Sequence, residues 1–215
     1  MQKAQYHKWL GQKQAQQCVT NLEKNGFKAV FFPNLAEARA YILADIDGYE
    51  SFGFGGSDTT RQLNIIDQLI RQKKVVYDHW VKDLTPEASL EIRRNQARCD
   101  CFFCSANAIS LSGEIVNVDG VGNRTSAMAF GPQKVIIVAG INKLTPDLQT
   151  ALQRVKETAG PMRAKSLSVK TPCAETGICT DCHSPRRICR ITTILHRKPM
   201  LTDVNVVIIN EALGF

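Results

Sequence analysis

The segment QKVIIVAG, residues 133–140, gives the clearest indication of the fold. It is a continuous apolar run, without the alternation of polar and apolar residues that marks a strand with one face in water. Such runs are typical of strands in parallel sheets, which are covered on both faces by the helices that connect the strands. The segment therefore predicts an α/β fold with a mainly parallel central sheet flanked by helices.

The residues before this strand support that prediction, because short apolar segments alternate with amphipathic ones. Two of the amphipathic segments carry the start signals of helices. Ser57 and Asp58 are favoured N-caps, and Thr85 precedes Pro86, a residue that suits the first helical position. In a mainly parallel sheet, ligands are expected at the carboxyl ends of the strands. The expected strands are residues 27–33, 49–55 and 74–80, and the expected helices are residues 34–46, 57–73 and 85–98.

At 215 residues, the chain is long enough for one domain with a substantial core. No internal repeat or low-complexity linker divides it, so residues 1–215 are predicted to form a single α/β domain. A cysteine-rich loop, about residues 171–190, is expected to be inserted into that domain. The other expected elements are a leading helix at residues 1–25, two short strands around the Ser112-Gly113 turn, helices at residues 121–131 and 145–160, the second ending at Gly160, and late strands at residues 191–197 and 205–215.

The formal net charge of +7 is concentrated in one region, since residues 163–198 contain eight Lys and Arg but only two Asp and Glu. A local basic patch attracts an anion, either a phosphate ligand, an acidic partner protein or the thiolates of the same region. No DNA- or RNA-binding motif accompanies it, which argues against nucleic acid. There is no signal-peptide h-region and no run of roughly 18 apolar residues, so we expect a cytoplasmic protein with no membrane span.

The first candidate site is GFGGSDTT, residues 53–60, between an expected strand and an expected helix. Glycines allow a sharp turn there, and free amides at the start of a helix attract anions. The segment lacks the third glycine of the dinucleotide-binding pattern and the Gly-Lys-Ser/Thr of a P-loop. A plain glycine turn before a capped helix is the alternative. The ligand-binding candidates are Gly55, Gly56, Ser57 and Thr59.

The second candidate site is NAISLSGEIVNVDGVGNRTSAMAFGP, residues 107–132, where polar residues and glycines are interleaved at expected strand ends. An α/β protein builds its pockets at such places. Glu114 or Asp119 is the candidate catalytic acid or base, and Arg124 could hold an anion through two hydrogen bonds. The alternative is that Asp119 and Asn123 only bind their own turns. The further ligand-binding candidates are Asn107, Gly120, Gly122 and Asn123.

The third candidate site is the cysteine loop, TPCAETGICTDCHSPRRICR, residues 171–190. Both zinc and a 4Fe-4S iron-sulfur cluster accept four cysteine ligands. Only Cys179 and Cys182 have the Cys-x2-Cys spacing of a zinc knuckle. The irregular gaps therefore favour a 4Fe-4S cluster over zinc, and free or redox-paired thiols are the third alternative. The predicted metal ligands are Cys173, Cys179, Cys182 and Cys189.

The other four cysteines are expected in the core. Cys99, Cys101 and Cys104 lie in a strand-like segment, where neighbouring side chains face opposite ways, and Cys18 lies on the apolar face of the leading helix. A reduced cysteine behaves as a small apolar residue when it is buried. These positions are therefore predicted to stabilise the fold rather than to bind a metal.

Several of these motifs together resemble the lactate-utilisation (LUD) domain family, in particular its single-domain members with a C-terminal four-cysteine motif. The resemblance implies a fold similar to that of the sugar-phosphate isomerases and CoA-transferases, with a central, mostly parallel sheet. The family commonly has Thr-Gly just before the central Asn-Ala, whereas this chain has Cys104-Ser105 ahead of Asn107. The resemblance is carried by FGGSDTT, NAISLSGEIVNVDGVGNRTSAMAFGPQKVIIVAGINKL, PCAETGICTDCHSPRRICR and the terminal VVIINEALGF.

The family resemblance implies a role in the utilisation of lactate or another organic acid. One hypothesis is a redox or accessory component of lactate oxidation, in which the four cysteines hold an iron-sulfur cluster and partner redox subunits take part. The alternative is a non-redox enzyme that acts on a sugar-phosphate or CoA-linked small molecule and has a structural metal loop. A regulatory subunit without turnover is the third hypothesis. A small anionic substrate or ligand is expected, and in the non-redox alternative GGSDTT and DGVGNR hold the anion.

Overall fold

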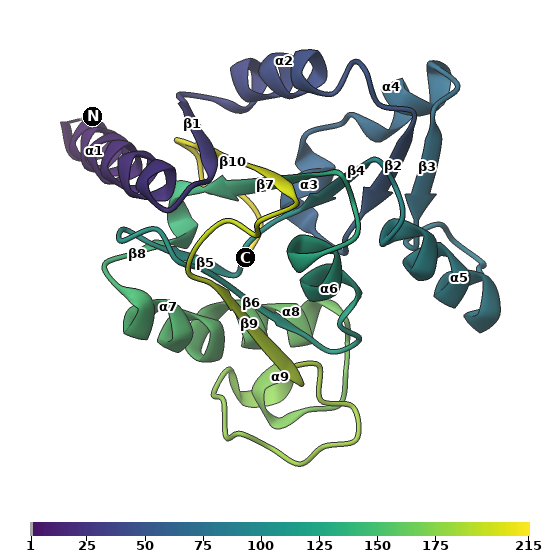
Figure 1. Ribbon diagram of the computed structural model, residues 1–215. Helices are drawn as coiled ribbons and strands as arrows, with labels where there is room; N and C mark the ends of the chain where they lie inside the picture. Colours follow the sequence, from purple (N-terminus) through teal and green to yellow (C-terminus); the bar gives the residue numbers. More distant parts are fainter. Residues whose placement is uncertain (1) are drawn as a thin grey trace.

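The structure is a computed structural model that describes residues 2–215, with side chains described from residue 5 onward. A six-stranded sheet forms its centre, and every pair of neighbouring strands in it is parallel (Figure 1). The predicted α/β fold with a mainly parallel sheet is therefore confirmed. In spatial order the strands are β1 (Lys28–Phe32), β10 (Asp203–Ile209), β7 (Lys134–Gly140), β4 (Cys101–Cys104), β2 (Ser51–Phe54) and β3 (Val75–Asp78).

A second, four-stranded sheet packs against one face of the first, and the sequence did not predict it. Strands β5 and β6 form its hairpin around the predicted Ser112-Gly113 turn, where Gly113 has a φ of 92°. The last strand, β9, runs antiparallel to β6 and directly follows the cysteine loop. In spatial order the strands are β8 (Leu144–Thr145), β5 (Ala108–Ser110), β6 (Ile115–Asp119) and β9 (Ile191–Leu195).

Helices cover the outer faces of the two sheets (Figure 1). Helices α2, α3 and α4 lie over the six-stranded sheet, and α7 lies over the far face of the smaller one. No described helix is long and apolar enough to cross a membrane. The predicted leading helix is observed as α1, and Met1 lies outside the described residues. The α-helices are α1 (Gln2–Lys24), α2 (Leu35–Asp45), α3 (Asp58–Gln62), α4 (Ile66–Arg71), α5 (Pro86–Gln96), α6 (Asn123–Ala129), α7 (Leu148–Arg154), α8 (Gly160–Ser166) and α9 (Pro172–Thr176).

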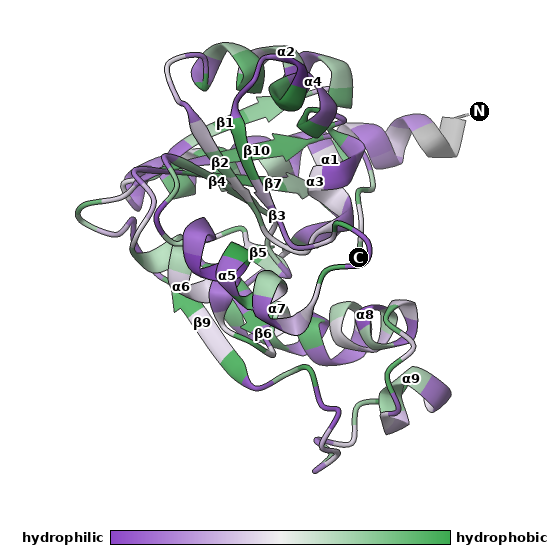
Figure 2. Ribbon diagram, turned by 90° about the vertical axis from the view of Figure 1, so that its right-hand side faces the viewer, coloured by the Kyte–Doolittle hydropathy of each residue, from purple (hydrophilic) through white to green (hydrophobic). Residues whose placement is uncertain are grey.

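The hydrophobic core has one main layer on each face of the six-stranded sheet. Because successive residues of a strand face opposite sides, Cys101 and Phe103 of β4 enter the layer beneath α2, whereas Phe102 and Cys104 enter the layer between the sheets. Figure 2 shows hydrophobic residues concentrated on the central strands, whereas α2 and α5 also carry hydrophilic residues.

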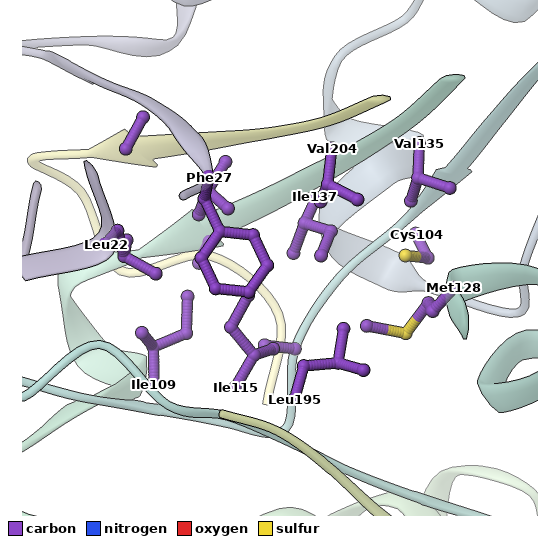
Figure 3. Packing of buried hydrophobic residues seen from close by; sticks show 14 of the residues in the cluster. Leu22, Phe27, Cys104, Ile109, Ile115, Met128, Val135, Ile137, Leu195 and Val204 are labelled. Carbon is purple, nitrogen blue, oxygen red and sulfur yellow. The ribbon is translucent and has the colours of Figure 1, made fainter. Parts of the chain in front are cut away.

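The layer between the sheets joins residues that are far apart in the sequence. In Figure 3, Ile109 and Ile115 of the small sheet face Ile137 and Val204 of the large one. All four side chains are fully buried, and burial of a side chain of this size contributes about 1.5–3 kcal/mol. This layer fixes the small sheet against one face of the large sheet.

Two predicted helices differ from the observed ones. The helix predicted at residues 145–160 does not end at Gly160, because α7 continues through the π-helical turn Val155–Ala159 into α8. Pro161 has no amide hydrogen, and the wider turn lets the helix pass it. The helix predicted at residues 57–73 is divided into α3 and α4 at Asn64, whose φ is 51°.

Candidate functional site

A cavity of about 280 Å³ lies at the carboxyl ends of the parallel strands, where the sequence placed the ligand site. Segments that follow β2, β3, β4 and β7 contribute to its walls. The cavity brings together the two glycine-containing motifs that the sequence analysis identified. The predicted site residues that line it are Gly56, Ser57, Thr59, Asn107, Asp119, Gly120, Asn123 and Arg124.

Three predicted site residues lie outside the cavity wall. The amide of Gly55 donates to Phe103 O at 2.8 Å and fixes the turn after β2. Gly122 has a φ of 94° and begins α6. Glu114 lies at the turn of the β5–β6 hairpin, where its carboxylate accepts from Ser112 Oγ at 2.6 Å. Gly55 and Gly122 shape the backbone beside the cavity, and Glu114 is not placed to act on a ligand inside it.

Asp119 and Arg124 form an ion pair in the cavity wall. Arg124 Nε and Nη2 donate to Asp119 Oδ1 at 2.9 and 2.5 Å, and the amide of Thr125 donates to Oδ2 at 3.0 Å. Arg124 Nη2 also donates to Asn107 Oδ1 at 3.1 Å and to Val118 O at 2.9 Å. With both carboxylate oxygens occupied, Asp119 holds its turn in place rather than presenting a free base. This geometry favours the turn-binding alternative for Asp119.

The same turn is closely connected to the cysteine loop. A Cβ added to Gly120 would lie 3.0 Å from Ile188 O, so the absence of a side chain allows this close approach. The amide of Arg190 donates to Asp119 O at 2.9 Å. The predicted metal loop and the predicted ligand motif therefore meet in space.

The sequence analysis missed Lys143, which lies in the wall of this cavity just after β7. Its Nζ donates to Thr59 Oγ1 and to Ser105 Oγ, both at 2.8 Å. Only 4% of the residue is exposed, and no carboxylate among the described side chains lies within 4 Å of Nζ. The signal that could have identified it is a cationic residue three positions beyond Gly140, the end of a parallel strand that is apolar from Val135 onward.

Burial shifts the pKa of Lys143 strongly. Loss of hydration, which is the largest cause, together with the positive charges of Arg154 and Arg124 lowers the pKa from 10.5 to about 7. A substantial fraction of this amine is therefore neutral near neutral pH. Perturbed lysines of this kind are concentrated at functional sites.

Several other side chains in the cavity wall offer hydrogen-bond donors to an anion. His79 Nδ1 accepts from Gln96 Nε2 at 2.9 Å, so the proton of the neutral ring is on Nε2. Burial and the charge of Arg93 lower the pKa of His79 to about 4, which keeps the ring neutral. The guanidinium group of Arg163 stacks 4.9 Å from the centre of the Trp80 ring. The wall thus combines neutral donors with guanidinium groups.

The four predicted metal ligands of the cysteine loop line a second cavity, of about 230 Å³. All four thiols are free and partly exposed. Among the described residues, no three His, Cys, Asp or Glu side chains are gathered closely enough to hold a single metal ion. The four predicted ligands therefore surround one cavity and do not converge on one point. They are Cys173, Cys179, Cys182 and Cys189.

Arg187 holds the backbone of this loop. Its Nε and Nη1 donate to Cys189 O at 2.7 Å and to Cys182 O at 2.9 Å, and Nη2 forms an ion pair with Asp181 at 2.6 Å. Gly177, with a φ of 77°, ends α9 and turns the chain toward Cys179. One side chain therefore fixes the relative positions of two predicted ligands.

The two cavities share a wall. Both are lined by Val118, Val155, Gly160, Ile188 and Cys189. Val155 begins the π-helical turn, and a Cβ added to Gly160 would lie 2.7 Å from Val155 O, so glycine is required at this close contact. Turns of this type occur frequently at functional sites.

Comparison with known proteins agrees with the fold. The family model described as the LUD domain matches residues 15–209, which is most of the chain. The chain belongs to the LUD domain family. Among solved structures, this chain is similar to a DUF162 family protein from Deinococcus radiodurans, with 12% sequence identity and a TM-score of 0.52. The alignment covers 93% of this LUD chain and 98% of the DUF162 chain. At that identity the likeness shows the fold alone.

Two further comparisons add nothing to this assignment. Ribose 5-phosphate isomerase from Plasmodium falciparum matches 52% of the LUD chain and 54% of its own, with 17% identity and a TM-score of only 0.29. A search of curated proteins found no match.

The cysteines outside the loop occupy the core of this LUD domain, as predicted. Cys18, Cys99, Cys101 and Cys104 are buried, and desolvation raises the pKa of each thiol. These thiols therefore stay protonated and unreactive. Ser105, in the Cys104-Ser105 pair that departs from the family pattern, is the residue that accepts a hydrogen bond from Lys143.

Proposed function

We propose that this LUD protein is an iron-sulfur component of organic-acid utilisation that binds a small organic anion beside its metal loop. Family membership provides the link to lactate utilisation. The observation that carries the proposal is the position of Cys189, which lines both the cavity at the strand ends and the cavity of the four cysteines. A ligand in the first cavity would then lie against a cluster ligand.

The arrangement of the thiols supports a 4Fe-4S cluster over a single zinc ion. Four cysteines surround one cavity without three of them gathering on one point, which suits a cluster whose ligands bind different metal atoms. When bound, such a cluster supplies one-electron transfer. The residues that would hold it are Cys173, Cys179, Cys182 and Cys189, and Arg187 holds the backbone at two of them.

The charges around the first cavity support an anionic ligand. Arg93 and Arg163 each donate hydrogen bonds to the described residues from Nη1 alone. The N–H groups on Nε and Nη2 of these two arginines are therefore free to bind a ligand. Asp58 and Asp119 also line the cavity, but each is paired with an arginine. A carboxylate or phosphate is the ligand that guanidinium groups bind best.

Anaerobic purification followed by iron and sulfide analysis and EPR spectroscopy tests the proposal. We expect brown protein with about four iron and four sulfide per chain and a reduced-state EPR signal that changes when L-lactate or pyruvate is added. Cys182→Ala should lose the metal, whereas the matched core variant Cys101→Ala should retain it. Colourless protein that carries one zinc per chain would contradict the proposal.

The basic surface of the metal loop supports a partner redox subunit with an acidic face. Arg186 and Arg190 lie on the exposed part of the loop, close to the predicted ligands. Electrostatic attraction of this kind accelerates encounter and weakens with salt. Reduction of the cluster by a partner should therefore slow as ionic strength rises, and Arg186→Glu should slow it further.

The second candidate function is a non-redox enzyme that acts on a sugar phosphate or CoA-linked molecule. The observation in its favour is the buried amine of Lys143, which offers acid–base chemistry without a metal. A thermal-shift screen with sugar phosphates and CoA esters tests it, with Arg163→Met as the variant that should lose the response. Turnover by the fully metal-free protein would favour this function over the first.

A further inference from the structure

The amine of Lys143 has surroundings that differ from those of a structural lysine. Buried lysines normally pair with a carboxylate. Here the two partners of Nζ are hydroxyl groups, Thr59 Oγ1 and Ser105 Oγ, each at 2.8 Å. Each hydroxyl in turn lies within donating distance of a backbone carbonyl, Leu213 O at 3.2 Å and Ala106 O at 3.4 Å. This arrangement holds the nitrogen in place without neutralising a positive charge.

The neutral form of the amine can make both hydroxyl contacts. A neutral primary amine has two N–H groups and one lone pair. With both N–H groups directed at Thr59 and Ser105, the remaining direction belongs to the lone pair, and Lys143 lines the cavity. The lowered pKa of Lys143, caused by desolvation and by Arg154 and Arg124, supports the same protonation state.

The same cavity also contains groups that can bind the anionic part of a ligand. Arg93 and Arg163 line it and keep N–H groups that bind none of the described residues. A volume of about 280 Å³ suits a small molecule. A ligand that used both features would have a negative group and an electrophilic carbon a short distance apart.

We propose that Lys143 is a nucleophile that forms an imine with the carbonyl group of a small anionic carbonyl compound. A 2-oxo acid and a phosphorylated ketose or aldose share the required chemistry. The inference deepens the function proposed above, because it rests on the same anion-binding cavity. Lysines that are desolvated and close to other cations are activated for this reaction.

The reaction balances without an oxidant or reductant. The Nζ lone pair attacks the carbonyl carbon, the C=O π electrons move to the oxygen, and the oxygen takes up a proton as Nζ releases one. The resulting carbinolamine loses its hydroxyl group, with a proton, as water, and a C=N bond forms. Thr59 and Ser105 are hydrogen-bonded to Nζ and are therefore placed to exchange protons with it.

Borohydride trapping tests this inference on the full-length protein, both anaerobically purified and after removal of metal. The protein is mixed with pyruvate in one arm and with dihydroxyacetone phosphate in the other, and borohydride then converts any imine to a stable secondary amine. Peptide mass spectrometry locates the modified lysine. L-Lactate replaces pyruvate in a control arm, because it has the same charge but no carbonyl group to trap.

Binding is measured separately, so that failure of trapping and failure of the proposed function can be distinguished. Trp80 lines the cavity, whereas Trp9 lies on α1 and is 56% exposed. In a Trp9→Phe background, Trp80 is therefore the one tryptophan fluorophore, and its emission reports a ligand in the cavity.

We expect one reduced ligand on Lys143, from pyruvate if the ligand is an oxo acid and from dihydroxyacetone phosphate if it is a sugar phosphate. Lys143→Arg, which keeps N–H donors at this position but cannot form the imine, should abolish the adduct, and the exposed control Lys82→Arg should not change it. Ligand that saturates the Trp80 signal without an adduct on Lys143 would overturn the inference and leave the proposed anion site intact. Absence of both adduct and Trp80 response, or an adduct confined to other lysines, would also overturn it.

Discussion

Replacement of Lys143 by methionine should change how the stability of the protein depends on pH. The native-state pKa of this amine is about 7, whereas the ordinary value is 10.5. Between those values the unfolded chain binds a proton that the native protein does not, so the free energy of unfolding of the wild type rises with pH. From pH 7 to pH 9, this single group contributes an increase of about 2 kcal/mol, and Lys143→Met lacks that increase.

Urea denaturation of both proteins at pH 7, 8 and 9 measures this difference. Among the groups that act on the amine is the thiol of Cys104, and burial raises the pKa of that thiol to about 12, above this range. Titration of unfolded cysteines is common to both proteins and cancels in the comparison. The exposed control Lys82→Met should run parallel to the wild type. Parallel curves for Lys143→Met and the wild type would refute the reasoning, because they would show that the amine stays protonated.

Three further predictions concern the core and the metal loop. Cys101→Ser buries a hydroxyl group at a fully buried position of β4, and should lower the free energy of unfolding by about 1–3 kcal/mol in urea denaturation. The iron content should not change, and a loss of iron would place Cys101 among the ligands. Gly140→Ala would press a Cβ against the backbone of Glu211 and Leu213, and should lower the free energy of unfolding by about 3 kcal/mol or more. A melting temperature equal to that of the wild type would contradict this packing. Arg187→Met should increase the rate of metal loss to a chelator by about tenfold, and an unchanged rate would exclude a role of the guanidinium in holding the loop.

The sequence predicted the large sheet and several helix starts, because these features depend on local signals. The segment predicted as a strand at residues 133–140 forms β7 (Lys134–Gly140), whose residues are all buried. Ser57 and Thr85 act as N-caps, accepting from the amides of Thr60 and Ala88. In each case, residues that are adjacent in the sequence are sufficient to determine the strand or the helix start.

The sequence did not predict the small sheet, the π-helical turn or Lys143, because each depends on contacts between distant segments. Strand β9 is defined by its pairing with β6, which lies far earlier in the chain. Lysine is normally a surface residue, and only the packing of Thr59 and Ser105 around Lys143 reveals its burial. The meeting of the metal loop with the strand ends has the same origin, since Gly120 approaches Ile188 only in the folded chain.

The wall between the two cavities has a thermodynamic consequence. Ile188 and Cys189 face both spaces, so any shift of this segment on metal binding also reshapes the other cavity. If loading of the metal loop tightens binding of the organic anion by some factor, the anion must tighten retention of the metal by the same factor. A metal content that changes with the small anions present during purification would be the signature of this coupling.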